Sequence, residues 1–191
     1  MDESLESLPE EELVRLSVAG DRDARELLVR RYERSAFRVA YHLLGSSDDA
    51  RDAVQESFYR ALKRLSSLRG RFGPWFFRIL TNVCTDERRR RRRAAVLPLT
   101  GTERAEPNPD FDLRSLVREA LRLLPERYRT VIVLRDIEGF SSREAAEMLG
   151  INEGAARVLL LRARRRLADL VSQLEEGQQW KSATGTSTTR S

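Results

Sequence analysis

Apolar residues at spacings of three and four recur along nearly the whole of this 191-residue chain, with no useful length of strand-type alternation. Such spacing places apolar side chains on one face of an α-helix, whereas a half-buried strand needs a period of two. One stripe runs from Ala50 to Leu65, and another runs from Ala156 to Leu174. The pattern therefore predicts an all-α protein.

Proline and glycine separate the helical pattern into two blocks. Residues 98–110 hold Pro98, Gly101, Pro107 and Pro109 with almost no apolar periodicity, which is typical of a linker. We therefore expect two small helical domains joined by a flexible linker. The predicted divisions are an acidic lead with a short helix at 1–23, a first domain at 24–93, the linker at 94–111, a second domain at 112–175 and a disordered tail at 176–191.

Capping residues refine the helix ends in both blocks. Asp21 or Asp23 can cap the second helix, Ser47 the third, and Pro74 suits the first turn of the fourth. In the second block the predicted helices span 113–124, 125–136, 141–149 and 153 to about 175. The short first helix is predicted from Pro9 to about residue 19.

Several classes of protein are disfavoured by what the sequence lacks. No aliphatic run is long enough to span a bilayer, and the acidic amino terminus precedes no apolar core of a secretory signal. The single cysteine, Cys84, allows neither an internal disulfide nor a cysteine-based zinc site, which fits the reducing cytoplasm. His42 is the only histidine, and no glycine-rich phosphate loop or carboxylate site is visible. We expect no catalysis, cofactor, metal or membrane insertion.

The positive charge is concentrated in two segments. Residues 69–93 hold nine arginines against Asp86 and Glu87, and residues 154–170 hold five arginines against Asp169. Most charge runs are solvated helix faces, but such faces mix signs, and the six consecutive arginines at 88–93 do not. The planar guanidinium suits phosphate and guanine, so the two segments favour a nucleic acid as partner.

Residues 141–168 have the pattern of a helix-turn-helix. Ser141 or Ser142 can cap the first helix with Glu144 in a capping box, and Gly150 stands where the turn needs an unhindered residue. In the second helix Ala156, Leu160, Ala163, Leu167, Leu170 and Leu174 form the core-facing stripe. The candidate contacts with duplex DNA are Arg143, Arg157, Val158, Leu161, Arg162 and Arg164.

Two alternatives stay open for this second helix. An ordinary antiparallel helix pair also has a glycine between helices. The exposed apolar residues Val158, Leu159 and Leu161 could contact thymine methyl groups, or they could cover the apolar surface of a protein partner.

The first block offers two further faces. Asp52, Gln55, Glu56 and Tyr59 project together from helix 49–65, and this acidic face suggests a basic protein partner rather than a nucleic acid. Residues 69–93 mix arginine with aromatic residues, a combination that binds single-stranded nucleic acid by stacking on bases and following the backbone. Phe76 or Phe77 should be core, and Phe72 is the best stacking candidate.

Taken together, these residues resemble the extracytoplasmic-function group of bacterial RNA polymerase sigma factors. The resemblance covers about residues 24–171. Its most specific segments are 49–58, 75–88, 124–128 and 141–164. One departure is the start of the recognition helix, Gly154–Leu160, where apolar side chains replace two polar residues and one cation of the usual pattern.

The resemblance implies a partner for each face. Helix 49–65 would dock on the β′ clamp helices of core RNA polymerase through Asp49, Asp52, Gln55, Glu56 and Tyr59. The −10 promoter element would be opened and bound by Arg69, Arg71, Phe72, Trp75, Arg78, Asn82, Arg88 and Arg89. The helix-turn-helix would bind the −35 element, and the linker would pass through polymerase near its active centre and RNA exit path. The implied partner is core RNA polymerase, with its β′ and β subunits. An anti-sigma factor is a usual partner in this group. The alternative function is a helix-turn-helix regulator that binds duplex DNA without polymerase.

Overall fold

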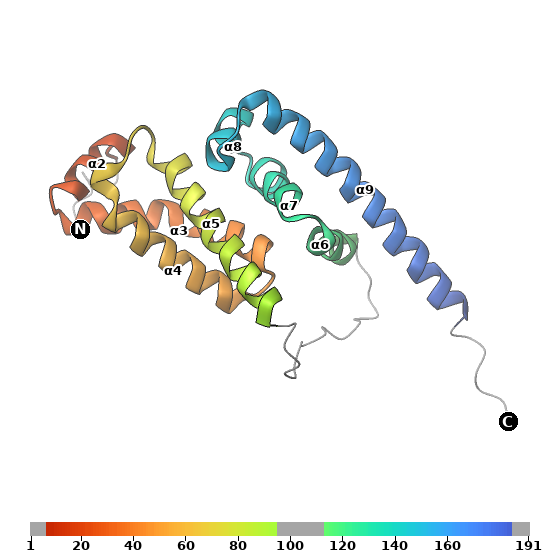
Figure 1. Cartoon of the computed structure of the whole chain (residues 1–191). Coiled ribbons are helices and arrows are strands. Elements are labelled where there is room, and N and C mark those ends of the chain that lie inside the picture. The colour runs from red at the N-terminus through yellow and green to blue at the C-terminus, as the bar shows by residue number, and fades with distance from the viewer. Residues whose placement is uncertain (1–6, 95–112, 185–191) are drawn as a thin grey trace.

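The computed structural model describes residues 7–94 and 113–184, and all of its regular elements in those ranges are helical (Figure 1). The first unit contains α2 (Glu10–Val18), α3 (Arg22–Leu44), α4 (Ser47–Lys63), the 3₁₀ helix η1 (Leu65–Ser67) and α5 (Phe72–Ala94). The second contains α6 (Leu113–Leu123), α7 (Glu126–Ile132), the π-helix η2 (Val133–Ile137), α8 (Ser142–Leu149) and α9 (Glu153–Thr184). The all-α prediction is confirmed.

Local capping accounts for the helix boundaries in the first unit. Asp21 accepts a hydrogen bond from the Ala24 backbone N–H at 3.0 Å, and Gly45 ends α3 with a left-handed φ of 78°. The cap of α4 is Ser46, not Ser47 as the sequence suggested. Ser46 has the extended backbone that lets its hydroxyl accept from the Asp49 N–H, whereas Ser47 is already helical.

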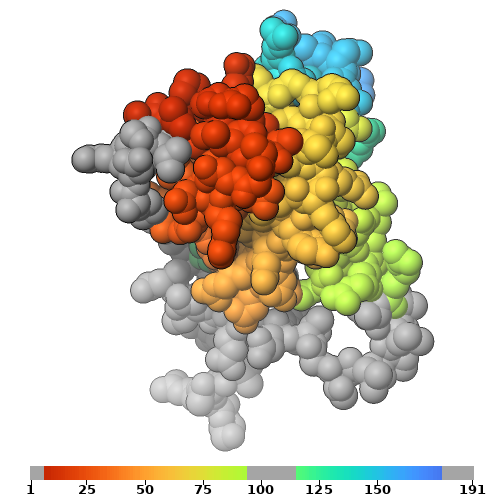
Figure 2. Space-filling model, turned by 90° about the vertical axis from the view of Figure 1, so that its left-hand side faces the viewer, coloured from red at the N-terminus to blue at the C-terminus, as the bar shows by residue number. Residues whose placement is uncertain are grey.

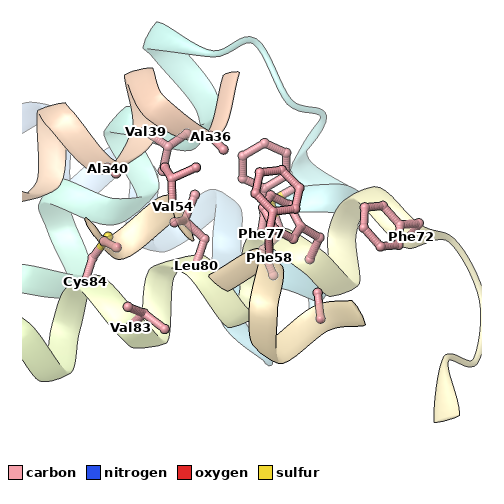
Figure 3. Close-up of a cluster of buried hydrophobic side chains, with 14 of the residues drawn as sticks. Ala36, Val39, Ala40, Val54, Phe58, Phe72, Phe77, Leu80, Val83 and Cys84 are labelled. Atoms are coloured by element: carbon pink, nitrogen blue, oxygen red, sulfur yellow. The ribbon is translucent and has the colours of Figure 1, made fainter. Parts of the chain in front are cut away.

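The core of the first unit is rich in aromatic rings (Figure 3). Phe76 and Phe77 are fully buried, as expected, and the ring of Phe76 stacks on that of Phe58 with centroids 4.4 Å apart. Phe72 is also buried, at 1% exposure, and its ring centroid lies 5.2 Å from that of Tyr32. The start of α5 is therefore anchored by three aromatic side chains.

Helix α2 ties the amino-terminal segment to α5. Its Glu10 accepts hydrogen bonds from the hydroxyl of Tyr32 and from the backbone N–H of Phe72, the latter at 2.9 Å. The end-on view in Figure 2 shows the red residues of α2 directly against the yellow segment that holds η1 and the beginning of α5. The acidic amino-terminal segment thus supplies one carboxylate, that of Glu10, to the first turn of α5.

The second unit packs its own smaller core around α9. The predicted stripe is confirmed, because Ala156, Leu160, Ala163 and Leu170 are buried and Leu167 packs against the same cluster. Leu159 also packs partly into this core, so its expected exposure was wrong. Helix α9 continues past residue 175 to Thr184, which corrects the predicted disordered tail over that stretch. Residues 185–191 and the linker residues 95–112 lie outside the described residues.

The two units pack against each other. Val133, Leu134, Ala145 and Met148 of the second unit belong to the main core cluster of the first. The ring of Phe140 meets that of Phe77 edge to face at 4.8 Å. Helix α8 consequently lies against α5 (Figure 1), and η2 lies against α3.

Two polar links reinforce this packing between the units. Glu138, whose side chain is fully buried, pairs with Arg38 at 2.6 Å and accepts from the Ser35 hydroxyl at 2.9 Å. The buried Arg129 donates to the backbone carbonyls of Leu124 and Leu43, each at 3.2 Å. Burial lowers the pKa of Arg129 to about 10, so the guanidinium stays charged at neutral pH and satisfies carbonyls at the ends of α6 and α3.

Candidate protein and nucleic-acid interfaces

The outer ridge of α4 separates two grooves. The exposed residues Asp52, Gln55 and Tyr59, with Glu56 half-buried beside them, project from this ridge as the sequence predicted. Tyr59 is 58% exposed, and its ring lies 5.1 Å from the Lys63 ammonium. An exposed aromatic residue beside these polar side chains suits a protein partner, because aromatic residues are enriched at protein interfaces.

The groove between α4 and α5 is acidic and has a volume of about 390 Å³. We call it the acidic groove; its charged lining residues are Asp49, Asp52, Glu56, Arg60, Asp86, Glu87 and Arg90. Asp49 is paired with Arg91, and Glu56 is paired with Arg60 at 2.6 Å. Hydrogen bonds from Arg90, and then from Arg91, hold the pKa of Glu87 below its usual value against the opposing effect of burial. Carboxylates outnumber guanidinium groups in this lining, so the groove carries net negative charge.

The groove on the opposite side of the ridge has a different character. It lies between α3 and α4, with a volume of about 840 Å³ and an apolar floor that includes Val29, Phe37, Val54 and Phe58. Gln55 stands at its edge. Sequence reasoning missed both grooves, because Asp86, Glu87 and Phe37 belong to neighbouring helices and only packing brings them beside α4.

The candidates for −10 binding divide into buried, engaged and exposed groups. Phe72 is buried among aromatic rings, which corrects its assignment as the least committed ring for stacking. Trp75, another of the predicted residues, is only partly buried and lies one turn further along α5. Asn82, Arg69 and Arg78 are exposed, and Arg69 donates to the neighbouring Leu68 carbonyl at 3.3 Å.

Several arginines of α5 and the loop before it face the second unit. Arg71 donates to Glu144 of α8 at 2.9 Å. A Cβ placed on Gly150, in the turn after α8, would lie 3.4 Å from the guanidinium of Arg78. Arg89 lies 3.8 Å from Glu126 at the start of α7. The basic side of α5 is therefore partly covered by the carboxylates and the turn of the second unit.

Arg88 differs from its neighbours in the run of arginines. Its guanidinium is half-buried, and burial lowers its pKa. In the part of the chain that the structure describes, its buried Nη1 atom has no hydrogen-bond partner. The negative charge of the nearby Glu126 partly offsets the effect of burial on the Arg88 pKa.

The helix-turn-helix has the geometry that the sequence predicted. Ser141 and Glu144 form a capping box, with the Ser141 hydroxyl accepting from the Glu144 N–H at 3.2 Å. Gly150 takes a left-handed φ of 66° at the turn, and Asn152 caps α9 by accepting from the Ala155 N–H at 2.7 Å. Ala145 and Ala146 are buried in the inner face. Small residues on that face let α8 and α9 approach closely.

The outer surface of α8 and α9 is open to a ligand. The side chains of Arg143 and Arg157 are 81% and 69% exposed, and they pair with Glu147 and Glu153, each on the same helix as its arginine. Arg162 is exposed as well. Arg164 forms an ion pair with Asp136 of η2 at 2.6 Å, and this pair links the second helix of the helix-turn-helix to η2. Val158 and Leu161 are 48% and 52% exposed.

The two residues considered for acid–base or thiol chemistry lie in structural positions. His42 is half-buried in α3, and burial lowers its pKa. Cys84 is buried, and burial raises the pKa of its thiol to about 12. Within residues 7–94 and 113–184, His, Cys, Asp and Glu side chains form no group of three suited to a metal ion, and no helix there could cross a membrane.

Comparison with known families assigns both units to one class of protein. Residues 28–94 match the family model for sigma-70 region 2, and residues 114–167 match that for sigma-70 region 4. The fold and the two matched regions define a sigma factor of bacterial transcription. More narrowly, the chain belongs to the extracytoplasmic-function group of RNA polymerase sigma factors.

Individual relatives span most of the chain. It is 35% identical to the ECF RNA polymerase sigma factor SigM of Mycobacterium tuberculosis, over 87% of this chain and 86% of the relative. It is 30% identical to SigW of Bacillus subtilis, over 78% of this chain and 89% of that one.

Two solved structures share the arrangement of helices. CnrH in complex with the cytosolic domain of CnrY aligns with a TM-score of 0.69 and 28% identity, covering 86% of this chain and 97% of CnrH. The sigma factor RpoE of Bartonella quintana, in complex with the anti-sigma factor NepR, aligns with a TM-score of 0.60 and 26% identity. The second alignment covers 75% of this chain and 94% of RpoE.

Proposed function

We propose that this sigma factor directs core RNA polymerase to specific promoters in the cytoplasm, with three separate surfaces for three ligands. The ridge of α4 docks on polymerase, α5 and the loop before it open and bind the −10 element, and α8 with α9 binds the −35 element. The observation that carries the proposal is the order of surfaces: an anionic ridge, then a basic aromatic helix, then a basic helix-turn-helix. Catalysis belongs to the polymerase.

The docking surface is assigned to Asp52, Gln55, Glu56 and Tyr59, with Asp49 at its inner edge. Its negative charge would repel the phosphates of a nucleic acid, and its exposed tyrosine is a residue type enriched at protein interfaces. The acidic groove beside it offers carboxylates to basic side chains of the partner helix. To the residues proposed from the sequence we add Asp86 and Glu87, which line this groove.

The −10 surface is assigned to Arg69, Arg71, Trp75, Arg78, Asn82, Arg88 and Arg89. Trp75 supplies the aromatic face for an unstacked base, because Phe72 is committed to the core. The arginines follow the strand backbone. The proposed contacts with the −35 element are Arg143, Arg157, Val158, Leu161, Arg162 and Arg164.

A protein inhibitor is the remaining proposed partner. The alignment with RpoE is with a sigma factor bound to an anti-sigma factor, and that supports a partner of the same kind here. The predicted linker, residues 94–111, falls almost wholly within residues 95–112, which lie outside the described residues.

Reconstituted transcription tests the proposal. The full chain is mixed with core polymerase of its source bacterium, and run-off transcripts from fragmented genomic DNA are sequenced to find promoters. We expect specific start sites that vanish without the chain. Failure to form a complex with core, or to give any specific transcript, would refute the proposal. Sequence-specific gel shifts by the chain without core would instead favour a polymerase-independent regulator.

Charge reversal tests the docking surface separately. Asp52→Arg combined with Glu56→Arg should weaken core binding at least tenfold, because two carboxylates on the ridge become cations. The matched control is Glu26→Arg, an exposed acid on α3 that lines neither groove beside α4. Binding is measured by fluorescence anisotropy with labelled chain. Equal affinities for the double variant and the control would show that the ridge is not the docking surface.

A further inference from the structure

We propose that Val158 and Leu161 determine promoter specificity by contacting the 5-methyl groups of thymines in the major groove of the −35 element. This inference rests on the proposed function of α8 and α9, and it identifies the chemistry by which that surface recognises its DNA. We call Val158 and Leu161 the apolar strip. The starting observation is that large hydrophobic side chains stand on the outermost line of a helix otherwise coated with arginine.

The apolar strip lies opposite the buried face of α9. Residues 154, 158, 161 and 165 are separated by four, three and four positions, so they fall along one line of the helix. The buried residues Ala156, Leu160 and Ala163 lie on the other side. Leu159 turns toward the second core and is not part of the strip. Both members of the strip are about half exposed, so they contribute little to that core.

The strip begins where the helix can approach another molecule closely. Gly154 is exposed and heads the same line, and it carries no side chain to hold a ligand away from the backbone. Asn152 caps the helix just before it. The first turns of a recognition helix are the part that meets base edges in the major groove.

Flanking charge identifies the occupant as DNA rather than an apolar protein surface. Arg157 lies on one side of the strip, Arg162 lies on the other, and Arg165 follows it on the outer line. A protein covering the strip would have to desolvate these guanidinium groups. A helix in the major groove, about 12 Å wide, instead places flanking cations near the phosphates of the two strands.

The side chains then decide which base edge is read. Valine and leucine neither donate nor accept hydrogen bonds, so they cannot select guanine, cytosine or adenine by pairing with polar groups. Thymine alone presents a methyl group in the major groove, and apolar side chains are suited to it. Burying one methyl-sized group is worth a factor of about four in affinity.

The experiment removes the methyl groups and nothing else. Promoters found by run-off sequencing are made with thymine or 2′-deoxyuridine in the −35 element, and binding of the reconstituted holoenzyme is measured by competition. Deoxyuridine pairs as thymine does but lacks the 5-methyl group. We expect affinity to fall about fourfold for each contacted thymine replaced. The same replacement in the spacer should have no effect.

Variants link any loss to the strip. Val158→Ser with Leu161→Ser should bind the thymine promoter more weakly and should no longer distinguish thymine from deoxyuridine. The matched control is Val18→Ser, a valine on α2 that is 47% exposed and should leave the discrimination intact. Val158 and Leu161 are exposed, so the serine substitutions should not disturb folding, and circular dichroism of the variants checks this.

Each outcome bears on one of the two proposals. Specific initiation that depends on the −35 element but ignores deoxyuridine would overturn the inference and leave the proposed function standing. Discrimination that survives in the serine variant would overturn it too. Loss of core affinity in that variant would assign the strip to a protein partner. No specific initiation from any promoter would refute the proposed function itself, and the inference with it.

Discussion

The two basic surfaces of this sigma factor differ in what covers them. The basic side of α5 faces the second unit, where Arg71 meets Glu144 and Arg78 lies over the turn at Gly150. On the basic side of α9, Arg157 pairs with Glu153 of the same helix, and Arg164 pairs with Asp136 of η2. On the proposed assignments, DNA along α5 would compete with contacts between the two units, whereas DNA along α9 would compete with contacts inside the second unit, such as that of Arg164 with Asp136.

The comparison also separates aromatic residues that form core from those that could bind a base. Three aromatic residues of α5 are buried in the core: Phe72, Phe76 and Phe77. Among the aromatic residues of α5, Trp75 is the one that is partly exposed. In α9 the apolar residues divide in the same way, with one stripe inside and two side chains outside. The following substitutions test whether the covered and open surfaces behave differently.

The largest effect is expected from Phe76→Ala. The ring is fully buried between those of Phe58 and Phe72, and its removal should cost about 3–5 kcal/mol of unfolding free energy, since a large cavity is left. Urea denaturation measures it. Trp75→Ala is the control and should cost clearly less. Similar losses for the two variants would mean that Trp75 is as much a core residue as Phe76.

A smaller effect is expected at the contact between the units. Phe140→Ala removes the ring that meets Phe77 and should weaken the packing of the second unit on the first by about 1–3 kcal/mol. Small-angle scattering should show a larger radius of gyration, and binding of a single-stranded −10 oligonucleotide should improve. A variant as compact as the parent, with unchanged oligonucleotide affinity, would show that the covering of α5 does not limit access.

Glu144, which pairs with Arg71 across the contact between the two units, should make stability depend on pH. Its pKa is held below the usual value, first by the Ser141 backbone N–H and further by the Ser141 hydroxyl and Arg71. A carboxylate with a depressed pKa in the folded state contributes stability above its unfolded pKa, near 4.3, and the contribution is lost as pH falls through the folded value. Thermal melts from pH 6 to pH 3 should therefore show that the parent loses about 0.5–1 kcal/mol more of its unfolding free energy than Glu144→Gln does. If the stability of both proteins changed with pH in the same way, the charge of Glu144 would not contribute to stability.

The smallest effect on stability is expected at the open surface. Arg162→Ala should change the free energy of unfolding by less than about 0.5 kcal/mol, because the side chain is exposed. The same change should weaken holoenzyme binding to promoters, and a phosphate contact would lower the slope of log affinity against log salt by about 1. Destabilisation by more than 1 kcal/mol would mean that α9 is not a free surface at this position.

Local features were predictable from the sequence because short-range rules decide them. The periodic stripe from Ala156 to Leu170, the capping box at Ser141 and the left-handed Gly150 each follow from neighbours within a few residues. The acidic ridge of α4 was predictable for the same reason. One-residue details such as the cap at Ser46 depend on backbone angles that composition does not specify.

Features that depend on distant residues were not predictable. Phe72 was assigned to DNA because it stands in a loop-like stretch, but Tyr32 and Glu10 from other helices draw it into the core. Arg71 and Glu144 are 73 positions apart, and no periodic pattern links them. The acidic groove likewise needed the packing of α5 on α4 to bring Asp86 and Glu87 beside Asp52.

The buried Cys84 has a practical consequence for these measurements. With a pKa of about 12, only about one thiol in ten thousand is ionised at pH 8, and the side chain is out of reach of reagents. Cys84 of the native chain should therefore not react with maleimide dyes. Cysteines introduced at exposed sites on α4 and α9 could carry a donor and an acceptor dye without removing Cys84. Reaction of Cys84 itself would report that the aromatic core had opened.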